Sequence, residues 1–496
     1  MDFETRAVYV YLLLPLALGI IFIARGIKRG VSKLPPGPRG LPVIGNLHQL
    51  GAKPHQSLAK LAQRYGPIMS LELGQVTTVI ISSAAAAKQV MQKQDHLFAN
   101  RAVPDSLNAC NHAESAVIWL SLSPRWRELR KVMNSEIFNA RRMEAGVALR
   151  QQKVEELLGD VRASCELGEG VLIGEAAFKT SLNLLSTAIF SMNLDSWKAR
   201  DFKRSFREVV ELGGMANMVD YFPWLKRFDP QGIRARMEVP FTKMLAFLDS
   251  VIGERSALRA EQGSAYQNKD VLDTLLDISE TSEEIDREVI RHLLVALFIA
   301  GTDTTSSTVE WAMTEMLKNR DTMSKAKAEL ERVAGRGRPV QDTDLARLPY
   351  LQAIVKETLR VHPPAPLLLP RKTLEEIDLW DYTIPKGAQI SINAWAISRD
   401  AGAWEDPESF KPERFLDSDV DFRGANFELI PFGAGRRICP GLPLAYKVVH
   451  LMLGSLVNCF DWKLEGGAKA EDMDMDDKFG ITLQKTQPLC AIPSAI

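Results

Sequence analysis

A short stretch near the C-terminus constrains this chain more than any other. Residues 431–441 read Pro-Phe-Gly-Ala-Gly-Arg-Arg-Ile-Cys-Pro-Gly, and a largely apolar, helix-like run from Leu442 to Leu456 follows directly. Cys439 therefore lies just before a helix N-terminus and close to arginines, and both stabilise a negatively charged sulfur. Glycines let the backbone pass close to a flat cofactor, and Arg437 could pair with a carboxylate on that cofactor. Taken alone, these residues also allow a glycine turn with an inert, buried cysteine.

The spacing within this stretch is the more specific signal. It reads F-x-x-G-x-R-x-C-x-G, with the fixed positions at Phe432, Gly435, Arg437, Cys439 and Gly441. This pattern resembles the haem-ligand loop of the cytochrome P450 enzymes. The resemblance implies haem b as the cofactor, Cys439 as the metal ligand and the other four residues as cofactor-binding positions. A thiolate ligand pushes electron density toward bound dioxygen and favours cleavage of the O–O bond.

Length and composition fit one large enzyme domain. The chain has 496 residues, of which 46% are hydrophobic, so material for a core is ample. Its net charge of -1 implies no general attraction to nucleic acid. The five cysteines are widely spaced and contain no CxxC pair, so neither a zinc site nor a disulfide scaffold is indicated.

The N-terminus predicts a membrane anchor. Residues 7–24 carry no charge, and as a helix they would span about 27 Å, close to the roughly 30 Å hydrocarbon core of a bilayer. Four basic residues follow this run, and the positive-inside rule then places the rest of the chain in the cytosol (Arg25, Lys28, Arg29, Lys33). The alternative is a cleaved signal peptide, but the basic flank and the missing A-x-A-like site favour an uncleaved single-pass anchor.

A proline-rich segment separates this anchor from the remainder. Residues 34–38 read Leu-Pro-Pro-Gly-Pro, which breaks a helix and forms a stiff spacer. The segment resembles the hinge of microsomal cytochrome P450s, which implies the endoplasmic reticulum membrane. The predicted organisation is an anchor over residues 1–33, a hinge with the start of the globular part over 34–50, and a haem-thiolate catalytic domain over 51–496.

The chemistry-bearing helix is expected over residues 293–316. Its centre, Ala-Gly-Thr-Asp-Thr-Thr-Ser-Ser at 300–307, is poor helix-forming material, and the Thr304 hydroxyl can bond to the carbonyl of Ala300 four residues back. Asp303 beside Thr304 supplies an acid and an alcohol, the minimum set for relaying protons. By itself the motif allows a glycine kink with a capping aspartate. Its resemblance to the family's dioxygen-activation motif makes Asp303 and Thr304 the expected catalytic residues.

Arginines elsewhere complete the expected cofactor contacts. Trp126 and Arg130 stand i,i+4 on one helical face, and the family places such a pair on a haem propionate. Arg371, at the end of a proline-rich extended segment, is expected to make a similar contact. Without the resemblance, the basic residues around Arg130 would be interpreted as a solvated face, which could still dock an acidic redox partner.

A structural network is also expected. Glu357 and Arg360 stand i,i+3 in a largely apolar helix, and Arg414 lies in a Pro-Glu-Arg-Phe sequence. An exposed pair at this spacing would contribute little to stability. The resemblance implies instead that the three residues form one buried network.

Shorter sequence patterns predict further strands, a loop and the segments that contact the substrate. Residues 71–82 predict a hairpin that turns near Gly74, and residues 381–385 and 388–394 predict short strands. Residues 98–122 show poor periodicity and are interpreted as a loop. The resemblance places residues 365–369 and the apolar turn 479–483 beside the substrate.

The expected fold is therefore mainly α with small β-sheets, a cytochrome P450 fold with a single haem domain behind a transmembrane helix. The strings at 430–445 and 478–485 are similar to a plant subgroup of geraniol hydroxylases and ferruginol-synthase-type oxidases. This implies a monooxygenase for a small apolar plant metabolite, most simply a terpenoid. Because no G-x-G-x-x-G fingerprint occurs, electrons must come from a separate NADPH-cytochrome reductase. A phenolic or tyrosine-derived substrate is the alternative, and a membrane-tethered haem-binding protein without turnover is the alternative from another class.

Overall fold

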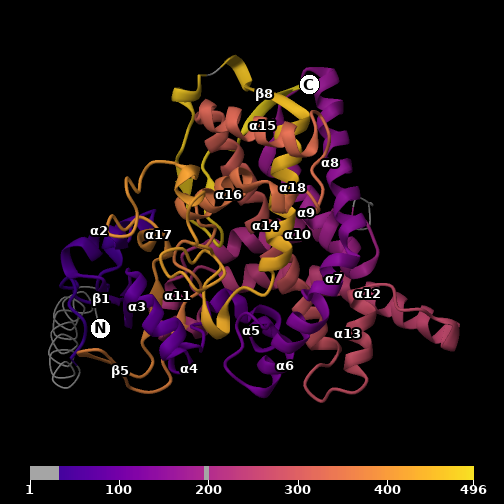
Figure 1. Ribbon diagram of the computed structural model, residues 1–496. Coiled ribbons are helices and arrows are strands. Elements are labelled where there is room, and N and C mark those ends of the chain that lie inside the picture. Colours follow the sequence, from indigo (N-terminus) through magenta and orange to yellow (C-terminus); the bar gives the residue numbers. More distant parts are fainter. Residues whose placement is uncertain (1–32, 195–199, 468) are drawn as a thin grey trace, which may run out of the picture.

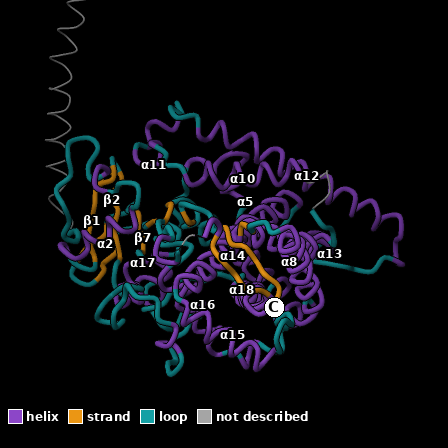
Figure 2. Tube along the Cα trace, turned by 90° about the horizontal axis from the view of Figure 1, so that it is seen from above, coloured by secondary structure: helices purple, strands orange, loops and turns teal. Residues whose placement is uncertain are grey.

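The computed structural model describes residues 33–194, 200–467 and 469–496. The predicted anchor at residues 7–24 lies outside these ranges. The described chain is mainly helical with four small sheets, as expected from the sequence. The four-stranded sheet lies at one side of the helical body, whereas the strands at residues 460–464 and 490–495 pack against the helices at 147–167 and 442–459 (Figures 1 and 2). The α-helices are α2 (Pro54–Tyr65), α3 (Ala84–Lys88), α4 (Asp95–Phe98), α5 (His112–Ser115), α6 (Pro124–Val132), α7 (Ala140–Ala145), α8 (Val147–Leu167), α9 (Ile173–Phe190), α10 (Arg200–Gly214), α11 (Met218–Tyr221), α12 (Ile233–Gln262), α13 (Val271–Ser279), α14 (Arg287–Lys318), α15 (Arg320–Ala334), α16 (Pro349–Val361), α17 (Ala394–Ile397) and α18 (Leu442–Cys459).

The strands are short and belong to four separate sheets. The largest has the order β1-β2-β7-β4, in which β1 and β2 form the predicted hairpin and β7 runs parallel to β2. Its register places Val79 opposite Ile390. The strands are β1 (Ile68–Leu73), β2 (Val76–Ile81), β3 (Val171–Leu172), β4 (Arg371–Lys372), β5 (Ile377–Leu379), β6 (Tyr382–Ile384), β7 (Gln389–Ile392), β8 (Phe460–Leu464), β9 (Asp477–Lys478), β10 (Gln484–Lys485) and β11 (Cys490–Ala495).

Helix α14 runs through the middle of the helical body (Figure 1). It packs against α9, α18, α16 and α12, which explains why its sequence is apolar on most sides rather than amphipathic. The Asp286 side chain caps its N-terminus by accepting a hydrogen bond from the Val289 N–H at 2.8 Å. Gly301 allows α9 to approach closely, since a Cβ there would lie 2.9 Å from a methyl group of Leu185.

Among the described helices, α18 is long and apolar enough to cross a membrane by length and composition, but 67% of it is buried in the protein.

The segment 98–122 differs from its expectation. It was predicted to be a loop, but it contains a 3-10 helix, η3 (Asp105–Asn111), followed by α5. The two are joined through Cys110 and Asn111, whose φ angles of 49° and 55° are left-handed. Each helical piece is too short to show helical periodicity in the sequence, which is why the pattern indicated a loop.

The predicted structural network is present, and its Glu357–Arg360 pair is fully buried. Arg360 forms a bidentate pair with Glu357, with N–O distances of 2.7 and 2.8 Å, and both side chains are 0% exposed. The Nε of Arg414 donates to the same carboxylate at 3.1 Å. The remaining Arg360 donors reach the carbonyls of Ser398, Pro407 and Ser409, so the network ties α16 to the segment before the Cys439 loop.

We expect Glu357→Gln to lower the free energy of unfolding by about 3–5 kcal/mol, because it leaves the buried Arg360 and the partly buried Arg414 without their counter-charge. Urea denaturation followed by circular dichroism measures this. Glu208→Gln is the matched control: its partner Arg204 is 72% exposed, so the change should stay within about 0.5 kcal/mol. A loss at Glu357 no larger than that at Glu208 would contradict the assigned role.

Candidate functional site

A large cavity of about 1770 Å³ lies between α14, the start of α18 and the four-stranded sheet. Its base contains Cys439 and its wall contains Thr304. Most of the predicted site residues line it, and two of them do not. Those lining it are Trp126, Arg130, Thr304, Arg371, Phe432, Arg437, Cys439 and Gly441, whereas Asp303 and Gly435 lie behind the wall.

Cys439 is presented to the cavity by a tight loop. Its N–H donates to the Phe432 carbonyl at 2.9 Å, and α18 begins three residues later. Burial raises the pKa of the Cys439 thiol, while the N–H groups of Gly441 and Leu442 and the charge of Arg130 lower it. Backbone donors at a helix start thus point at the sulfur, as a thiolate ligand requires.

Gly435 explains why this loop can lie so close to the neighbouring chain. Its φ is 67°, and a Cβ there would lie 1.8 Å from the carbonyl oxygen of Met91. No other residue could occupy the position without moving the backbone. Gly435 therefore shapes the loop from outside the cavity, and it is not one of the residues lining it.

Positive charge is concentrated at one edge of the cavity. Arg101, Arg130, Arg371 and Arg437 all line it, and burial lowers the pKa of each. Repulsion from the neighbouring arginines lowers the pKa further at Arg101 and Arg437. Burial brings the pKa of Arg371 to about 10 and, with repulsion from Arg371 and Arg130, that of Arg437 to about 9. Asp95 opposes the shift at Arg371, but within the described chain no acid offsets it at Arg101 or Arg437. Such a cluster requires an anionic partner.

The polar groups at this edge have the right chemistry for that partner. The Trp126 indole N–H is buried without a hydrogen-bond acceptor in the described chain, and the Arg437 guanidinium lies 4.5 Å from the centre of the same ring. Arg437 is further fixed by donating to the Ala99 and Val117 carbonyls. A flat group with two carboxylates, such as haem, fits a cavity with these donors on one side and a cysteine at its base.

Arg101 was missed by the sequence analysis. It reaches the cavity through an isolated antiparallel bridge to Arg371, and it donates to the carbonyls of Ile118 and Leu369. No local motif marks it, because its partners come from segments 17 and 268 residues away.

Asp303 and Thr304 point in different directions. The Thr304 hydroxyl donates to the Ala300 carbonyl at 2.8 Å, as predicted, and Thr304 lines the cavity. Consecutive helical residues point about 100° apart, so Asp303 faces elsewhere. Its Oδ1 accepts a hydrogen bond from the Gln484 side-chain amide at 2.8 Å, and burial raises the pKa of its carboxyl.

Above the cofactor region the cavity is mostly apolar. The predicted substrate segments both reach it, with Ala365 and residues 367–369 on one side and the turn 479–482 on the other. Leu185, Val209 and Leu297 add helical contacts from α9, α10 and α14. A small apolar molecule could be enclosed here with little polar desolvation.

Fold and site together define a haem protein. The comparison with known families agrees: the cytochrome P450 model matches residues 35–490. A geraniol 8-hydroxylase from Swertia mussotii is 52% identical over 100% of this chain and 99% of its own length, and one from Catharanthus roseus is 53% identical over 95% and 96%. A drimenol monooxygenase from Persicaria hydropiper is 49% identical over 94% and 93%.

The chain therefore belongs to the cytochrome P450 family. It is a haem-containing monooxygenase that acts on a small substrate with electrons from a redox partner.

A polar contact closes one side of the cavity. The Asp105 N–H donates to Asp220 Oδ1 at 2.7 Å, which joins η3 to α11, and Arg234 pairs with Asp105 at 3.2 Å. Burial, together with the nearby charge of Asp105, raises the pKa of Asp220 to about 6. Because the folded pKa exceeds the unfolded value, this group favours folding at low pH, and that contribution is lost as the pH rises from about 4 to 6.

We expect Asp220→Asn to be stabilising at pH 7.5, by up to about 3 kcal/mol, since Asn keeps the acceptor for Asp105 and removes the buried charge. The gain should shrink as the pH is lowered toward 5, where the parent carboxyl is largely protonated. Urea unfolding at both pH values tests this. An equal gain at the two values would show that charge burial is not the cause.

Proposed function

We propose that this chain hydroxylates a terpenoid. The observation that carries the proposal is the similarity, over nearly the whole chain, to enzymes named for geraniol and drimenol. The apolar upper cavity supports it, since a branched hydrocarbon with few polar groups is the kind of molecule that such walls accommodate.

In this proposal each group of residues in the cavity has its own role. Cys439 is the thiolate ligand of the iron. Arg101, Arg130, Arg371, Arg437 and the indole of Trp126 hold the carboxylates, while Phe432 and Gly441 border the cofactor and Gly435 shapes the loop. The haem supplies the oxygen-activating chemistry when bound. Asp303 and Thr304 bring protons from solvent into the cavity, and the apolar walls hold the substrate and exclude bulk water.

The electron donor in this proposal is a membrane-bound NADPH-cytochrome reductase. One substrate C–H bond, one dioxygen, two electrons and two protons give one hydroxylated product and one water. The docking surface is the basic face around Lys131 and Arg436 near the Cys439 loop, where the Arg436 side chain is 55% exposed and also pairs with Asp95.

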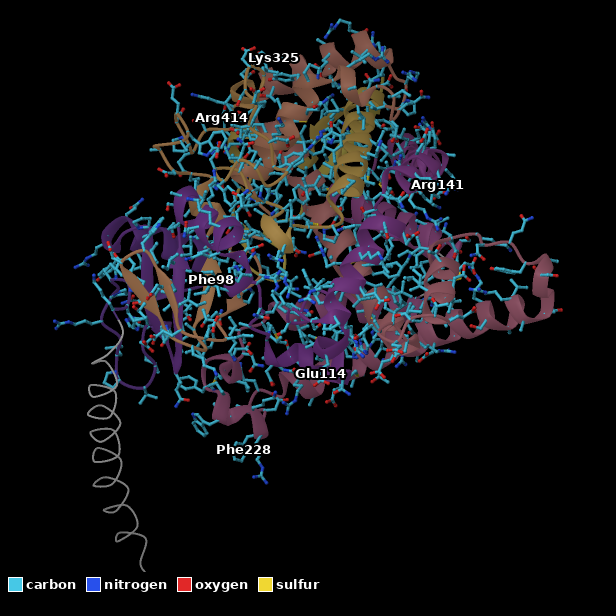
Figure 3. The ribbon with its side chains drawn as sticks, turned by 60° about the horizontal axis from the view of Figure 1, so that its bottom comes forward. Phe98, Glu114, Arg141, Phe228, Lys325 and Arg414 are labelled. Atoms are coloured by element: carbon cyan, nitrogen blue, oxygen red, sulfur yellow. The ribbon has the colours of Figure 1, made fainter. Side chains whose placement is uncertain are left out.

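We further propose that residues 1–33 anchor the protein in the endoplasmic reticulum membrane, that residues 34–50 join this anchor to the catalytic domain of residues 51–496, and that this domain faces the cytosol. Several exposed apolar side chains support a side of the domain that faces the membrane. Trp224 is 62% and Phe228 68% exposed, and Leu41, Val43 and Ile44 are also exposed. Figure 3 shows Phe228 at the outer edge of the molecule. Aromatic side chains in this setting suit a lipid interface.

Turnover in yeast microsomes that contain a plant reductase tests the substrate class. Geraniol, a diterpene olefin and tyrosine are offered separately, and the products are identified by mass spectrometry. We expect an NADPH-dependent hydroxylated terpenoid. Product from tyrosine alone would overturn the terpenoid proposal in favour of a phenolic substrate. No product from any of the three, with haem bound, would count against the proposed activity.

We expect Cys439→Ala to abolish the thiolate signature in the carbon monoxide difference spectrum, because Cys439 is the only cysteine among the described residues that line the cavity, and the thioethers of Met91, Met133 and Met215 cannot form a thiolate. Absorbance spectroscopy on purified protein measures this. Cys459→Ala, in the core and outside the cavity lining, is the matched control and should retain the signature. An unchanged spectrum in Cys439→Ala would exclude this residue as the ligand.

A further inference from the structure

The carboxyl group of Asp303 is held by the C-terminal hairpin of β9 and β10. Gln484, the first residue of β10, donates its side-chain amide to Asp303 Oδ1 at 2.8 Å. Asp303 itself is 5% exposed and does not line the cavity. An acid placed in this way needs a further group to pass its proton to the cavity side of α14.

Two oxygens beside this contact are buried and unpaired. Asp303 Oδ2 and the Thr482 hydroxyl have no hydrogen-bond partner in the described chain. The two groups are neighbours: the Thr482 side chain lies close enough to the Asp303 carboxyl to lower its pKa by a hydrogen-bonding contact, although the contact lacks the geometry of a regular hydrogen bond. Thr482 is only 3% exposed and lines the cavity, whereas Asp303 does not. Buried polar atoms of this kind are normally satisfied, and a single bridging water has enough partners here to do so.

The hairpin that carries both side chains is firmly attached to α14. The Ser307 hydroxyl donates to the Leu483 carbonyl at 2.7 Å, and the Leu483 N–H donates to the Pro364 carbonyl at 2.8 Å. Two residues after Leu483, the Lys485 ammonium lies 4.6 Å from the centre of the Trp311 ring. The positions of Thr482 and Gln484 relative to Asp303 are therefore fixed by contacts on both sides.

We propose that Thr482 conducts the proton from Asp303 into the cavity and that Gln484 is the positioning residue that keeps the carboxyl aligned for this transfer. The inference rests on the proposed role of Asp303. The protonated carboxyl gives its proton from Oδ2 to the Thr482 hydroxyl, directly or through one water. The hydroxyl releases its own proton on the cavity side, and the carboxylate is reprotonated from solvent, so one proton crosses the wall of α14 per cycle.

The electrostatics around the carboxyl suit a proton donor. Burial raises the pKa of Asp303, and the Gln484 and Thr482 contacts moderate the rise. Asp303 interacts electrostatically with Glu310, whose pKa is raised by burial and partly by Asp303, while the charge of Lys485 lowers the pKa of Glu310. A neutral amide at position 484 fixes Asp303 without stabilising its ionised form as strongly as a lysine or arginine would.

The first test compares Thr482→Val with Thr482→Ser in the full-length enzyme with its reductase, using geraniol as the probe. Val keeps the shape and removes the hydroxyl, whereas Ser keeps the hydroxyl. We expect Val to lower the fraction of NADPH electrons recovered in product severalfold, to release hydrogen peroxide and to change the solvent isotope effect. Ser should restore all three. Thr486→Val, at an exposed position of the same hairpin, should behave as the parent.

The second test does not depend on turnover. Infrared difference spectroscopy follows the C=O band of the protonated carboxyl, which is assigned by its loss in Asp303→Asn. In Gln484→Leu this band should shift and persist to higher pH, because a group that lowers the pKa is gone. Gln487→Leu, at an exposed position, should leave it unchanged. A band that is identical in Gln484→Leu and the parent would exclude the positioning role.

The outcomes separate this proposal from the one it rests on. If Asp303→Asn reduces coupling by about 10²-fold or more but Thr482→Val does not reduce it, the acid is correct and the route through Thr482 is wrong. If Asp303→Asn leaves coupling unchanged, the proposed role of Asp303 fails first. Equal substrate-binding spectra in Thr482→Val and Thr482→Ser would exclude a change in cavity shape as the cause of a difference in coupling.

Discussion

The concentration of buried positive charge at one edge of the cavity is the constraint on which the site depends. Four guanidinium groups converge there from segments that are far apart in the sequence, around residues 101, 130, 371 and 437. Repulsion between them would separate these segments unless an anion bridged them. The haem carboxylates can provide that bridge, so binding of the cofactor and closure of this part of the fold are coupled, and ligand binding to the folded state alone stabilises it.

The Glu357 network also brings two arginines together, but here a carboxylate of the protein itself supplies the counter-charge. Arg360 is buried and Arg414 is partly buried, and the Glu357 carboxylate pairs with both of them. This network orders the segment that leads to the Cys439 loop whether or not a cofactor is bound. The protein thus has one charge cluster that is complete in itself and a second, on the cofactor side, that is complete only when a dianion is present.

How much could be predicted from the sequence follows from how local each signal is. The Cys439 loop, the helix around Thr304 and the hairpin near Gly74 are encoded within a dozen residues each, and the structure contains all of them. Arg101 could not be found, because its place in the cavity depends on an isolated bridge to Arg371 across the fold. The short helices η3 and α5 were missed because α5 has only four residues and η3 is interrupted by the non-helical residues Ala109 and Cys110. That Asp303 and Thr304 face different sides follows from helix geometry, but which partner Asp303 would meet does not.

That partner gives the C-terminal hairpin more than one role. Its turn, residues 479–482, forms part of the substrate wall, while Gln484 two residues further on holds the acid. The turn and Gln484 belong to the same hairpin, and the Ser307 hydroxyl of α14 holds the Leu483 carbonyl between them. A substrate that displaces this turn therefore also acts on the contacts of Asp303. Substrate fit and the proposed proton supply are therefore linked through this one hairpin.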